Sequence, residues 1–207
     1  FSYRTFICTK ITMIMNIVLV DDSSIHQQLL PLTYTRPISY LRVGVFTLIE
    51  KWKNYLNTAN ISCLSEDYLQ EKYVPIIAEN NIFINSTIFP DQEIIKAIQL
   101  LNDGEQLYSG DLFIAYKGKN IEQRNVAEKI NFRSGVSSVN YYWDLFQNNA
   151  AEIVKDINFI KSQRDSQPLN DPFTHVYGQE NLFIEEGAKI RAAIIDAESG
   201  PVYIGKN

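Results

Sequence analysis

Residues 29–52 read LLPLTYTRPISYLRVGVFTLIEKW, and this stretch decides how the rest of the chain is interpreted. A short apolar run at 16–20 precedes it and ends in two aspartates. Apolar residues recur at helical spacing over 44–56, which predicts a helix packed on a sheet. A strand, a polar connection and a helix in this order are typical of an α/β domain, whose first loop lies at the ligand-binding carboxyl edge of the sheet. The connection carries Arg36 and Arg42, which are therefore candidates for binding an anion.

Three segments of this stretch carry a family resemblance: LPLT at 30–33, RP at 36–37 and LIE at 48–50. They resemble the opening of sugar-1-phosphate nucleotidyltransferases, and the similarity extends over almost all of residues 15–207. The chain looks most like a divergent, Bacteroidetes-type branch that is similar to the bifunctional enzymes making UDP-N-acetylglucosamine, in which the nucleotidyltransferase is fused to a hexapeptide-repeat acetyltransferase. The resemblance implies a Rossmann-like α/β nucleotidyltransferase domain, expected at 15–165.

Two departures from the family pattern affect how the charge of a triphosphate could be neutralised. Ordinary members have a glycine-rich loop whose backbone N–H groups wrap the phosphates, but His26-Gln27-Gln28 stands there and no glycine occurs in 16–43. The lysine usually found after Arg-Pro is Ile38. Arg36 and Arg42 are therefore predicted to be the catalytic, charge-neutralising groups, because the planar fork of arginine can bind two phosphate oxygens. The alternative for either arginine is an ion pair with a surface carboxylate.

The resemblance also implies substrate and metal ligands. Thr33, in the opening motif, is expected to bind substrate. Asn85 and Thr87 stand where the family has Asn-Gly-Asp, and they are expected to bind substrate. A hydroxyl is a poor replacement for a carboxylate on Mg²⁺, so either Asp91 or a different residue supplies the charge, or the metal is held differently; a polar turn is the alternative for this segment. Asn140 matches the family's Val-Asn metal ligand. Asp111 is a second candidate ligand for Mg²⁺, with a plain turn residue as the alternative.

Apolar spacing predicts alternating strands and helices along the rest of this domain. Trp52 is expected in the core. Asp144 is expected to be the N-cap of the last long helix, with Phe146 among its inward residues. Strands are predicted at 61–64, 82–85 and 112–116, and helices at 65–73, 90–101, 120–129 and from 145 to about 160.

The last forty or so residues show a different pattern. Residues 166–180, polar and rich in proline near their start, are predicted to be a linker. Residues 181–207 resemble hexapeptide repeats, which stack into a left-handed parallel β-helix. About three repeats are needed for stability, so the chain is expected to stop inside that domain. The resemblance implies acetyl-CoA as the cofactor of the missing acetyltransferase half and a homotrimer for the full-length protein.

Composition narrows the class of partner. The net charge of −5 argues against nucleic acid, because nucleic-acid modules usually show a basic face. Cys8 and Cys63 are far apart and have no partners at metal spacing, so reduced thiols and a cytoplasmic location are expected. No run reaches the ~20 apolar residues of a membrane span. Residues 1–14 are expected to be a non-native extension that precedes Met15.

The reaction implied is attack of a sugar-1-phosphate oxygen on the α-phosphorus of a nucleoside triphosphate, with release of pyrophosphate. Both substrates are anionic, so alignment and charge neutralisation by Mg²⁺ and cationic side chains would carry catalysis. UTP and N-acetylglucosamine-1-phosphate are the substrates that the resemblance suggests. Two alternatives stay open: an inactive sugar-nucleotide-binding protein, favoured by the missing glycine loop and lysine, and a trimeric assembly scaffold.

Overall fold

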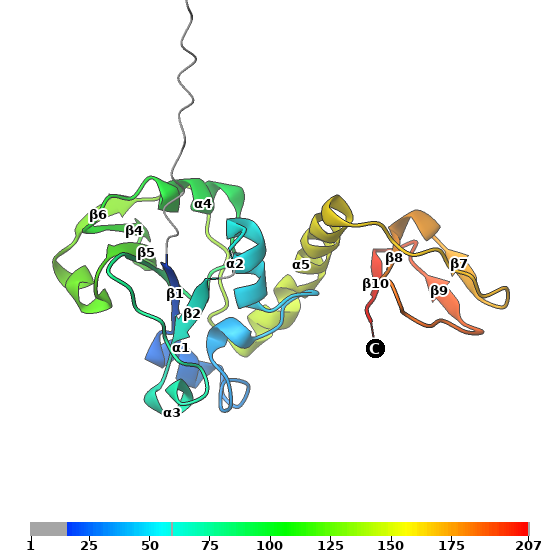
Figure 1. The fold of residues 1–207 in the computed structure, drawn as a ribbon, viewed down its shortest axis with the longest axis horizontal. Helices are drawn as coiled ribbons and strands as arrows, with labels where there is room; N and C mark the ends of the chain where they lie inside the picture. Colours follow the sequence, from blue (N-terminus) through cyan, green and yellow to red (C-terminus); the bar gives the residue numbers. More distant parts are fainter. Residues whose placement is uncertain (1–15, 59, 207) are drawn as a thin grey trace, which may run out of the picture.

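The computed structural model describes residues 16–58 and 60–206, so the expected extension at 1–14 lies outside the described residues. Within them, a mixed α/β body is joined by one long helix to a smaller unit of short strands (Figure 1). No helix in the described part of the chain has the length and apolar character needed to cross a membrane.

A six-stranded mixed sheet forms the centre of the body. Its strands are β1 (Asn16–Val20), β2 (Ile61–Leu64), β3 (Asn81–Asn85), β4 (Glu105–Ser109), β5 (Leu112–Gly118) and β6 (Glu128–Asn131). Their order is β2-β1-β3-β5-β4-β6. The first three strands run parallel, β5 is antiparallel to β3 and β4, and β6 is parallel to β4. The carboxyl ends of β1 to β4 therefore meet at one edge, beside the turn between β4 and β5.

Alternate residues of β1 face opposite sides of the sheet, as the pleat requires. Leu19 joins the main core, whereas Val18 packs with Phe83 in a smaller cluster on the other face. Trp52 is fully buried in the main core, and its indole Nε1 donates to the carbonyl of Ile88 at 3.0 Å. Its predicted core position is confirmed.

Side-chain caps set where the helices of the body begin. The helix expected over 44–56 is α2 (Leu48–Leu56), which starts late because Thr47 and Glu50 form a capping box. Asp91 caps α4 (Gln92–Gln99). The helix expected over 65–73 is only α3 (Asp67–Gln70), because the Ser65 hydroxyl donates to Asp21 and caps nothing.

Several short helical segments differ from the sequence expectation. The helix predicted over 120–129 is wrong: it is the 3₁₀ segment η2 (Ile121–Val126) followed by β6, whose residues pair with β4. Two further segments in the first connection were not predicted, α1 (Ser23–Gln28) and η1 (Ile38–Tyr40). Their contacts shape the candidate site below.

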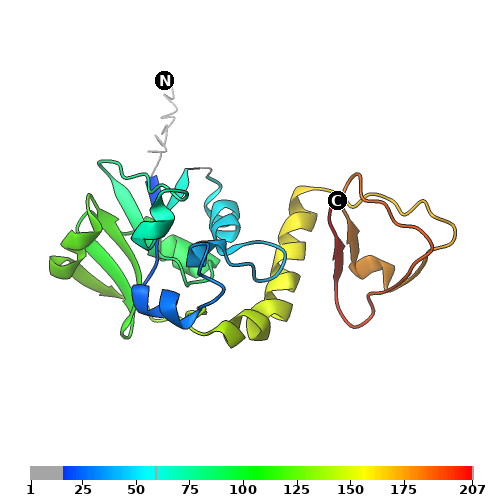
Figure 2. The same ribbon diagram turned by 90° about the horizontal axis from the view of Figure 1, so that it is seen from below.

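The long helix α5 (Tyr142–Gln163) leaves the body and reaches the smaller unit (Figure 2). The prediction that Asp144 is its N-cap is wrong, because the cap position is Tyr141 and Asp144 lies in the first turn. From there its carboxylate accepts hydrogen bonds from the backbone N–H groups of Asn140 and Tyr141, at 2.8 and 2.9 Å. Phe146 is 68% exposed, so its predicted inward position is also wrong.

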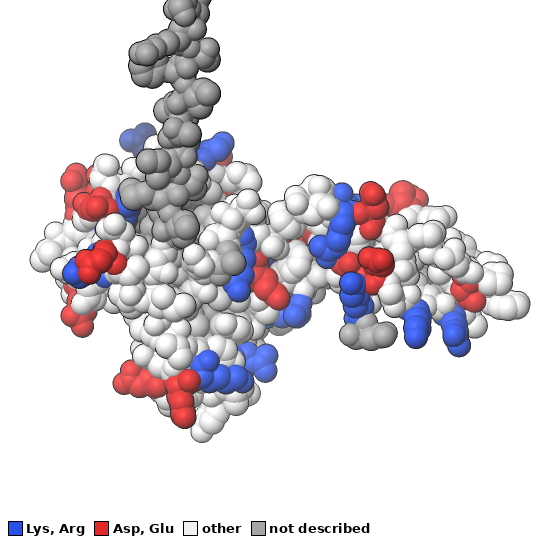
Figure 3. Space-filling view, viewed as in Figure 1, with Lys and Arg blue, Asp and Glu red and all other residues white. Residues whose placement is uncertain are grey.

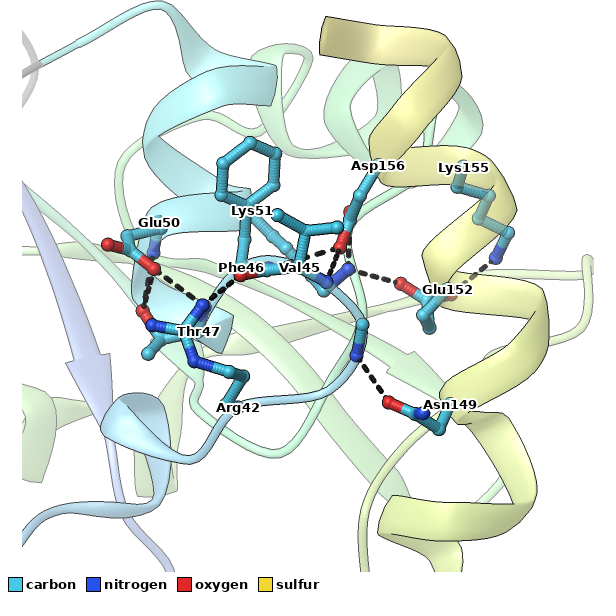
Figure 4. A network of polar contacts seen from close by, with 11 residues as sticks. Arg42, Val45, Phe46, Thr47, Glu50, Lys51, Asn149, Glu152, Lys155 and Asp156 are labelled. Carbon is cyan, nitrogen blue, oxygen red and sulfur yellow. Dashed lines mark hydrogen bonds and ion pairs between the residues drawn. The ribbon is translucent and has the colours of Figure 1, made fainter. Parts of the chain in front are cut away.

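A buried ionic cluster attaches α5 to the loop before α2 (Figure 4). Lys51 Nζ, with a side chain only 2% exposed, lies 2.5 Å from Asp156 Oδ1 and 2.8 Å from Glu152 Oε2. The other oxygen of Asp156 accepts the backbone N–H groups of Val45 and Phe46. These contacts compensate the desolvation of three charges and hold the loop against the helix.

The smaller unit contains two pairs of parallel strands. β7 (His175–Tyr177) pairs with β9 (Ile194–Asp196), and β8 (Leu182–Ile184) pairs with β10 (Val202–Ile204), with the 3₁₀ turn η3 (Gln179–Asn181) before β8. The residues of β7 fall inside the segment predicted to be a linker. Phe183 packs on Ile157 and Ile160 of α5, and Arg164 pairs with Glu185, so the unit is tied to the end of that helix.

Candidate active site at the carboxyl edge of the sheet

A cleft of about 630 Å³ opens at the edge where β1 and β3 end and the β4–β5 turn lies. Open α/β sheets bind their ligands at this edge. The segment from β1 into α1, the end of β3, the β4–β5 hairpin and η2 supply its walls. Its charged lining residues are Asp21, Asp22, Asp111 and Arg124.

The carboxylate of Asp21 holds the segments of this edge together. It accepts hydrogen bonds from the hydroxyls of Ser65 and Ser86, which follow β2 and β3, and from the backbone N–H of Ile38. Its Oδ2 also lies 3.3 Å from Nδ1 of His26 in α1. Because this side chain is only 1% exposed, its charge depends on these partners. Asp21 therefore fixes the ends of three strands relative to one another.

Asp22 precedes α1, the helix that contains the His26-Gln27-Gln28 stretch at the place of the family's glycine-rich loop. Its carboxylate accepts the backbone N–H groups of Ser24 and Ile25 and so caps α1. A further hydrogen bond from the Ser24 hydroxyl is the main cause that lowers the pKa of Asp22 below its ordinary value. The first N–H groups of this segment are thus already satisfied by a negative charge, where a glycine-rich loop would offer them to phosphate.

Arg124 is the one cation that lines the cleft among the described residues. Its guanidinium lies over the ring of Phe113, 4.4 Å from the centroid. Asp111, whose charge is opposite to that of Arg124, lies in the β4–β5 turn and is exposed. Its carboxylate makes no hydrogen bond or ion pair with any residue in 16–58 or 60–206. The sequence interpretation did not single out Arg124, whose only local signal was a place in a predicted helix.

Two of the predicted substrate residues form a closed polar turn after β3. The Asn85 amide donates to the carbonyl of Phe113 at 3.0 Å, and its oxygen accepts both the backbone N–H and the hydroxyl of Thr87. Asn85 lines the cleft, whereas Thr87 is completely buried. The structure therefore brings only Asn85 of this pair to the cleft.

The other predicted residues of the first connection lie away from the cleft lining. Thr33 has no exposed surface, and its hydroxyl donates to the carbonyl of His26 at 2.7 Å. Arg36 is exposed, and Arg42 donates through its guanidinium to the carbonyl of Val45, within its own loop (Figure 4). Neither arginine lines the cleft, so their catalytic role stays a prediction.

Only one of the two predicted metal ligands lines the cleft. Asp111 lines the cleft, but Asn140 is not among its lining residues. The Asn140 side chain donates to the Ser138 hydroxyl at 3.0 Å. The segment just before it runs beside the turn after β3, because the backbone N–H of Val139 donates to the carbonyl of Thr87. Asn140 therefore stays a predicted ligand.

The cleft still offers oxygen ligands of the kind that Mg²⁺ prefers. No group of three or more His, Cys, Asp or Glu side chains in the described residues could hold a metal ion. Mg²⁺, however, is usually held by one or two carboxylates together with substrate phosphates. Asp111 and Asp22 both line the cleft, and Asp111 has no partner among the described residues. Asp22 and Asp111 are thus the carboxylates in the cleft that could hold Mg²⁺ together with a nucleotide, and Mg²⁺ stays a prediction.

The remaining surface gives no sign of a polyanion site on the side that Figure 3 shows. Lysines and arginines there alternate with aspartates and glutamates and form no continuous basic stripe. The observed geometry is that of an α/β protein with a small polar cleft at the carboxyl edge of its sheet, suited to a small ligand.

Comparison with known families agrees with this class. The pattern of the family described as "Sugar nucleotidyl transferase" matches residues 17–165, which include all of the sheet except Asn16 and every residue that lines the cleft. The chain belongs to the sugar nucleotidyl transferase family. No curated protein matches the chain at the threshold applied.

Proposed function

We propose that this chain transfers a nucleotidyl group from a nucleoside triphosphate to a sugar-1-phosphate in the cleft at the carboxyl edge of the sheet. The observation that carries the proposal is the coincidence of the family match, residues 17–165, with all of the residues that line that cleft. Family membership makes nucleotides and sugar phosphates the expected substrates. UTP and N-acetylglucosamine-1-phosphate form the first pair to test, because the sequence resembles enzymes that use them.

The chain's own residues would act by alignment and charge neutralisation. A phosphate oxygen of the sugar phosphate attacks the α-phosphorus, and pyrophosphate leaves with the electron pair of the broken P–O bond. Arg124 would contact the phosphates, since it is the cation of the cleft. Asp22 and Asp111 would hold Mg²⁺, which neutralises phosphate charge when bound. Asn85, fixed by Phe113 and Thr87, would orient the substrate.

The negative charge of the cleft implies that nucleotide binding depends strictly on Mg²⁺. Asp22 and Asp111 line the cleft with a single arginine, and the carboxylate of Asp21 lies buried behind them, so a triphosphate entering alone would meet a net negative charge. Nucleotide binding is therefore expected to be weak without Mg²⁺ and much tighter with it.

The smaller unit supports a second part of the proposal. His175 pairs with Ile194 and Leu182 with Val202, each in parallel, as expected when successive coils of a solenoid stack. We take these pairs as the first coils of a left-handed β-helix. The resemblance, together with that assignment, would add acetyl transfer from acetyl-CoA and a homotrimer.

A pyrophosphate-release assay tests the main proposal. Four nucleoside triphosphates are combined with a panel of sugar-1-phosphates, with and without Mg²⁺, and calorimetry with UTP measures binding separately. We expect release with at least one pair, and a loss of about tenfold or more in turnover for Arg124→Gln, the scale of one charge-assisted contact. Arg133→Gln is the matched control, because Arg133 is exposed and does not line the cleft.

Arg36 is tested in the same assay. Arg36→Ala should weaken nucleotide binding by about 2 kcal/mol if this arginine reaches the phosphates, and Arg36→Lys should restore only part. Stability should change by less than ~0.5 kcal/mol because the side chain is exposed. Unchanged binding in Arg36→Ala would remove Arg36 from the catalytic assignment.

One observation favours a binding protein without turnover. Asp22 occupies the N-terminus of α1 with its own carboxylate, so that place cannot cradle a phosphate as it stands. Tight Mg²⁺-dependent binding of a sugar nucleotide, with no pyrophosphate released from any pair, would establish this alternative. Absence of both binding and release would refute both candidates.

A further inference from the structure

A second hollow, of about 310 Å³, lies beside the candidate active site. It is lined by His26, Gln27, Leu30, Tyr34, Glu66 and Tyr68. The helix α1 contributes to both hollows, since its residues before His26 line the cleft. The walls come from α1, the loop that follows it and the start of α3. Of the lining residues, only His26 has a contact described above, with the carboxylate of Asp21.

Two tyrosine rings give this pocket its aromatic walls. Tyr34 and Tyr68 are 67% and 59% exposed, unusually high for large aromatic side chains. Tyr68 is nevertheless held in place, because its hydroxyl lies 3.2 Å from Nε2 of His26. The imidazole of His26 is buried and is held on its other side by the Asp21 carboxylate. The chain Asp21–His26–Tyr68 therefore preorganises one ring before any ligand arrives.

The charge of the pocket is negative. The Glu66 carboxylate lines it and makes no hydrogen bond or ion pair with any residue in the part of the chain that the structure describes. Neither Lys nor Arg lines the pocket among those residues. A second carboxylate, that of Asp21, lies directly behind His26. A phosphate or carboxylate ligand is disfavoured here, and a cation is favoured.

We propose that this pocket binds a small organic cation, an ammonium or quaternary ammonium group, between the two tyrosine rings and the carboxylate of Glu66. The face of an aromatic ring attracts a cation through its quadrupole, and an unpaired carboxylate adds a Coulombic attraction. The apolar side chain of Leu30 would contact methyl or methylene groups of the ligand. The site is separate from nucleotidyl transfer and would exist whether or not the cleft is catalytic.

Matched probes test the site directly. Tetramethylammonium and choline are titrated into the whole protein by calorimetry, alongside 3,3-dimethyl-1-butanol, which has nearly the shape of choline but no charge. We expect the cations to bind on the order of tenfold tighter than the neutral compound, as cation–π and carboxylate contacts together would give. Equal binding of the charged and neutral compounds overturns the proposal, and so does binding of a nucleoside such as guanosine in place of the cations.

Variants locate the binding in this pocket. Tyr68→Leu and Glu66→Gln should each weaken choline binding at least about threefold. Tyr68→Phe keeps the ring but loses the contact with His26, so its loss should be smaller than that of Tyr68→Leu. Glu71→Gln is the matched control, because it removes a neighbouring negative charge that does not line the pocket. If Tyr68→Leu does not fold, Tyr34→Leu replaces it. Choline binding that is unchanged in Glu66→Gln and in the leucine variant refutes the assignment. None of these results depends on pyrophosphate release.

Discussion

Replacing Lys51 by Met tests how α5 is attached to the body. The ammonium group of Lys51 lies within 2.8 Å of carboxylates from both Glu152 and Asp156, and all three side chains are at most 6% exposed. Methionine has a similar length, so Lys51→Met removes the charge without opening a large cavity. Breaking a buried ionic group by removing one partner typically costs about 3–5 kcal/mol, because the other charge is left uncompensated. Asp156 keeps its hydrogen bonds from Val45 and Phe46, so we expect about 3 kcal/mol.

The pH dependence of this loss identifies its cause. Burial raises the pKa of Asp156 above its ordinary value of 3.8, and Lys51 opposes that rise. Without Lys51 the pKa of Asp156 should rise further. A carboxyl group whose pKa is higher in the folded state binds more protons there, so stability falls as pH rises from about 3.8 through the folded-state pKa. The destabilisation by Lys51→Met should therefore be larger at pH 7 than at pH 4.5.

Urea unfolding followed by circular dichroism at both pH values measures the effect. Lys155→Met is the matched control: Lys155 also contacts Glu152, at 2.7 Å, but its side chain is 51% exposed. Pairs this exposed contribute under ~1 kcal/mol. A cost for Lys51→Met that is no larger than that of Lys155→Met, or one that grows toward acid pH, would show that the buried charge is not the cause.

Three further predictions follow from other contacts. Gly44→Ala should destabilise by about 2 kcal/mol or more, measured by urea unfolding, because Gly44 has φ +80° and an added Cβ would lie 2.5 Å from Asp156 Oδ2. The Arg164 hydrogen bond lowers the pKa of Glu185, so their pair should stabilise the smaller unit above about pH 4.5, and this stabilisation should be lost as pH falls through the folded-state pKa. Hydrogen exchange of β8, compared with that of β3, measures the loss. Arg164→Gln should abolish this pH dependence of β8. Burial raises the pKa of the Cys63 thiol to about 11, so Cys63 should resist alkylation at pH 8 until the protein is unfolded, as peptide mapping by mass spectrometry would show.

The strands that were predicted correctly have a local apolar pattern in the sequence, whereas the missed elements are defined by contacts with residues outside them. Residues 61–64 and 82–85 are short apolar runs bounded by polar residues, and both form strands of the parallel part of the sheet. The strand β4 reads EQLYS, which has little apolar periodicity, and pairing with β5 and β6 defines it. Likewise, α1 has no apolar stripe, and its existence depends on the cap supplied by Asp22.

The location of the site could be predicted better than its side chains. A strand followed by a polar connection indicates the carboxyl edge of the sheet, and the cleft lies there. Which side chains reach it depends on tertiary contacts: Arg124 arrives from η2, far along the chain, while Arg42 is occupied by the carbonyl of Val45 in its own loop. A family motif places arginines in sequence, but the course of each loop decides what they contact.

Helix α5 makes an ionic contact with the body, through Asp156, and Arg164 after its last turn makes another with the smaller unit; the two carboxylates respond differently to acid. At the body, Asp156 has a raised pKa, so protonation as pH falls relieves an unfavourable buried charge. At the smaller unit, Glu185 has a lowered pKa, and protonation removes a favourable partner of Arg164. Acid is therefore expected to weaken the attachment of β8 to α5, whereas the raised pKa of Asp156 gives no corresponding loss of stability at the body as pH falls. Because the cleft and its lining all belong to the body, release of the smaller unit alone should leave nucleotide binding at pH 7 unchanged. The body is thus expected to bind nucleotide independently of the smaller unit.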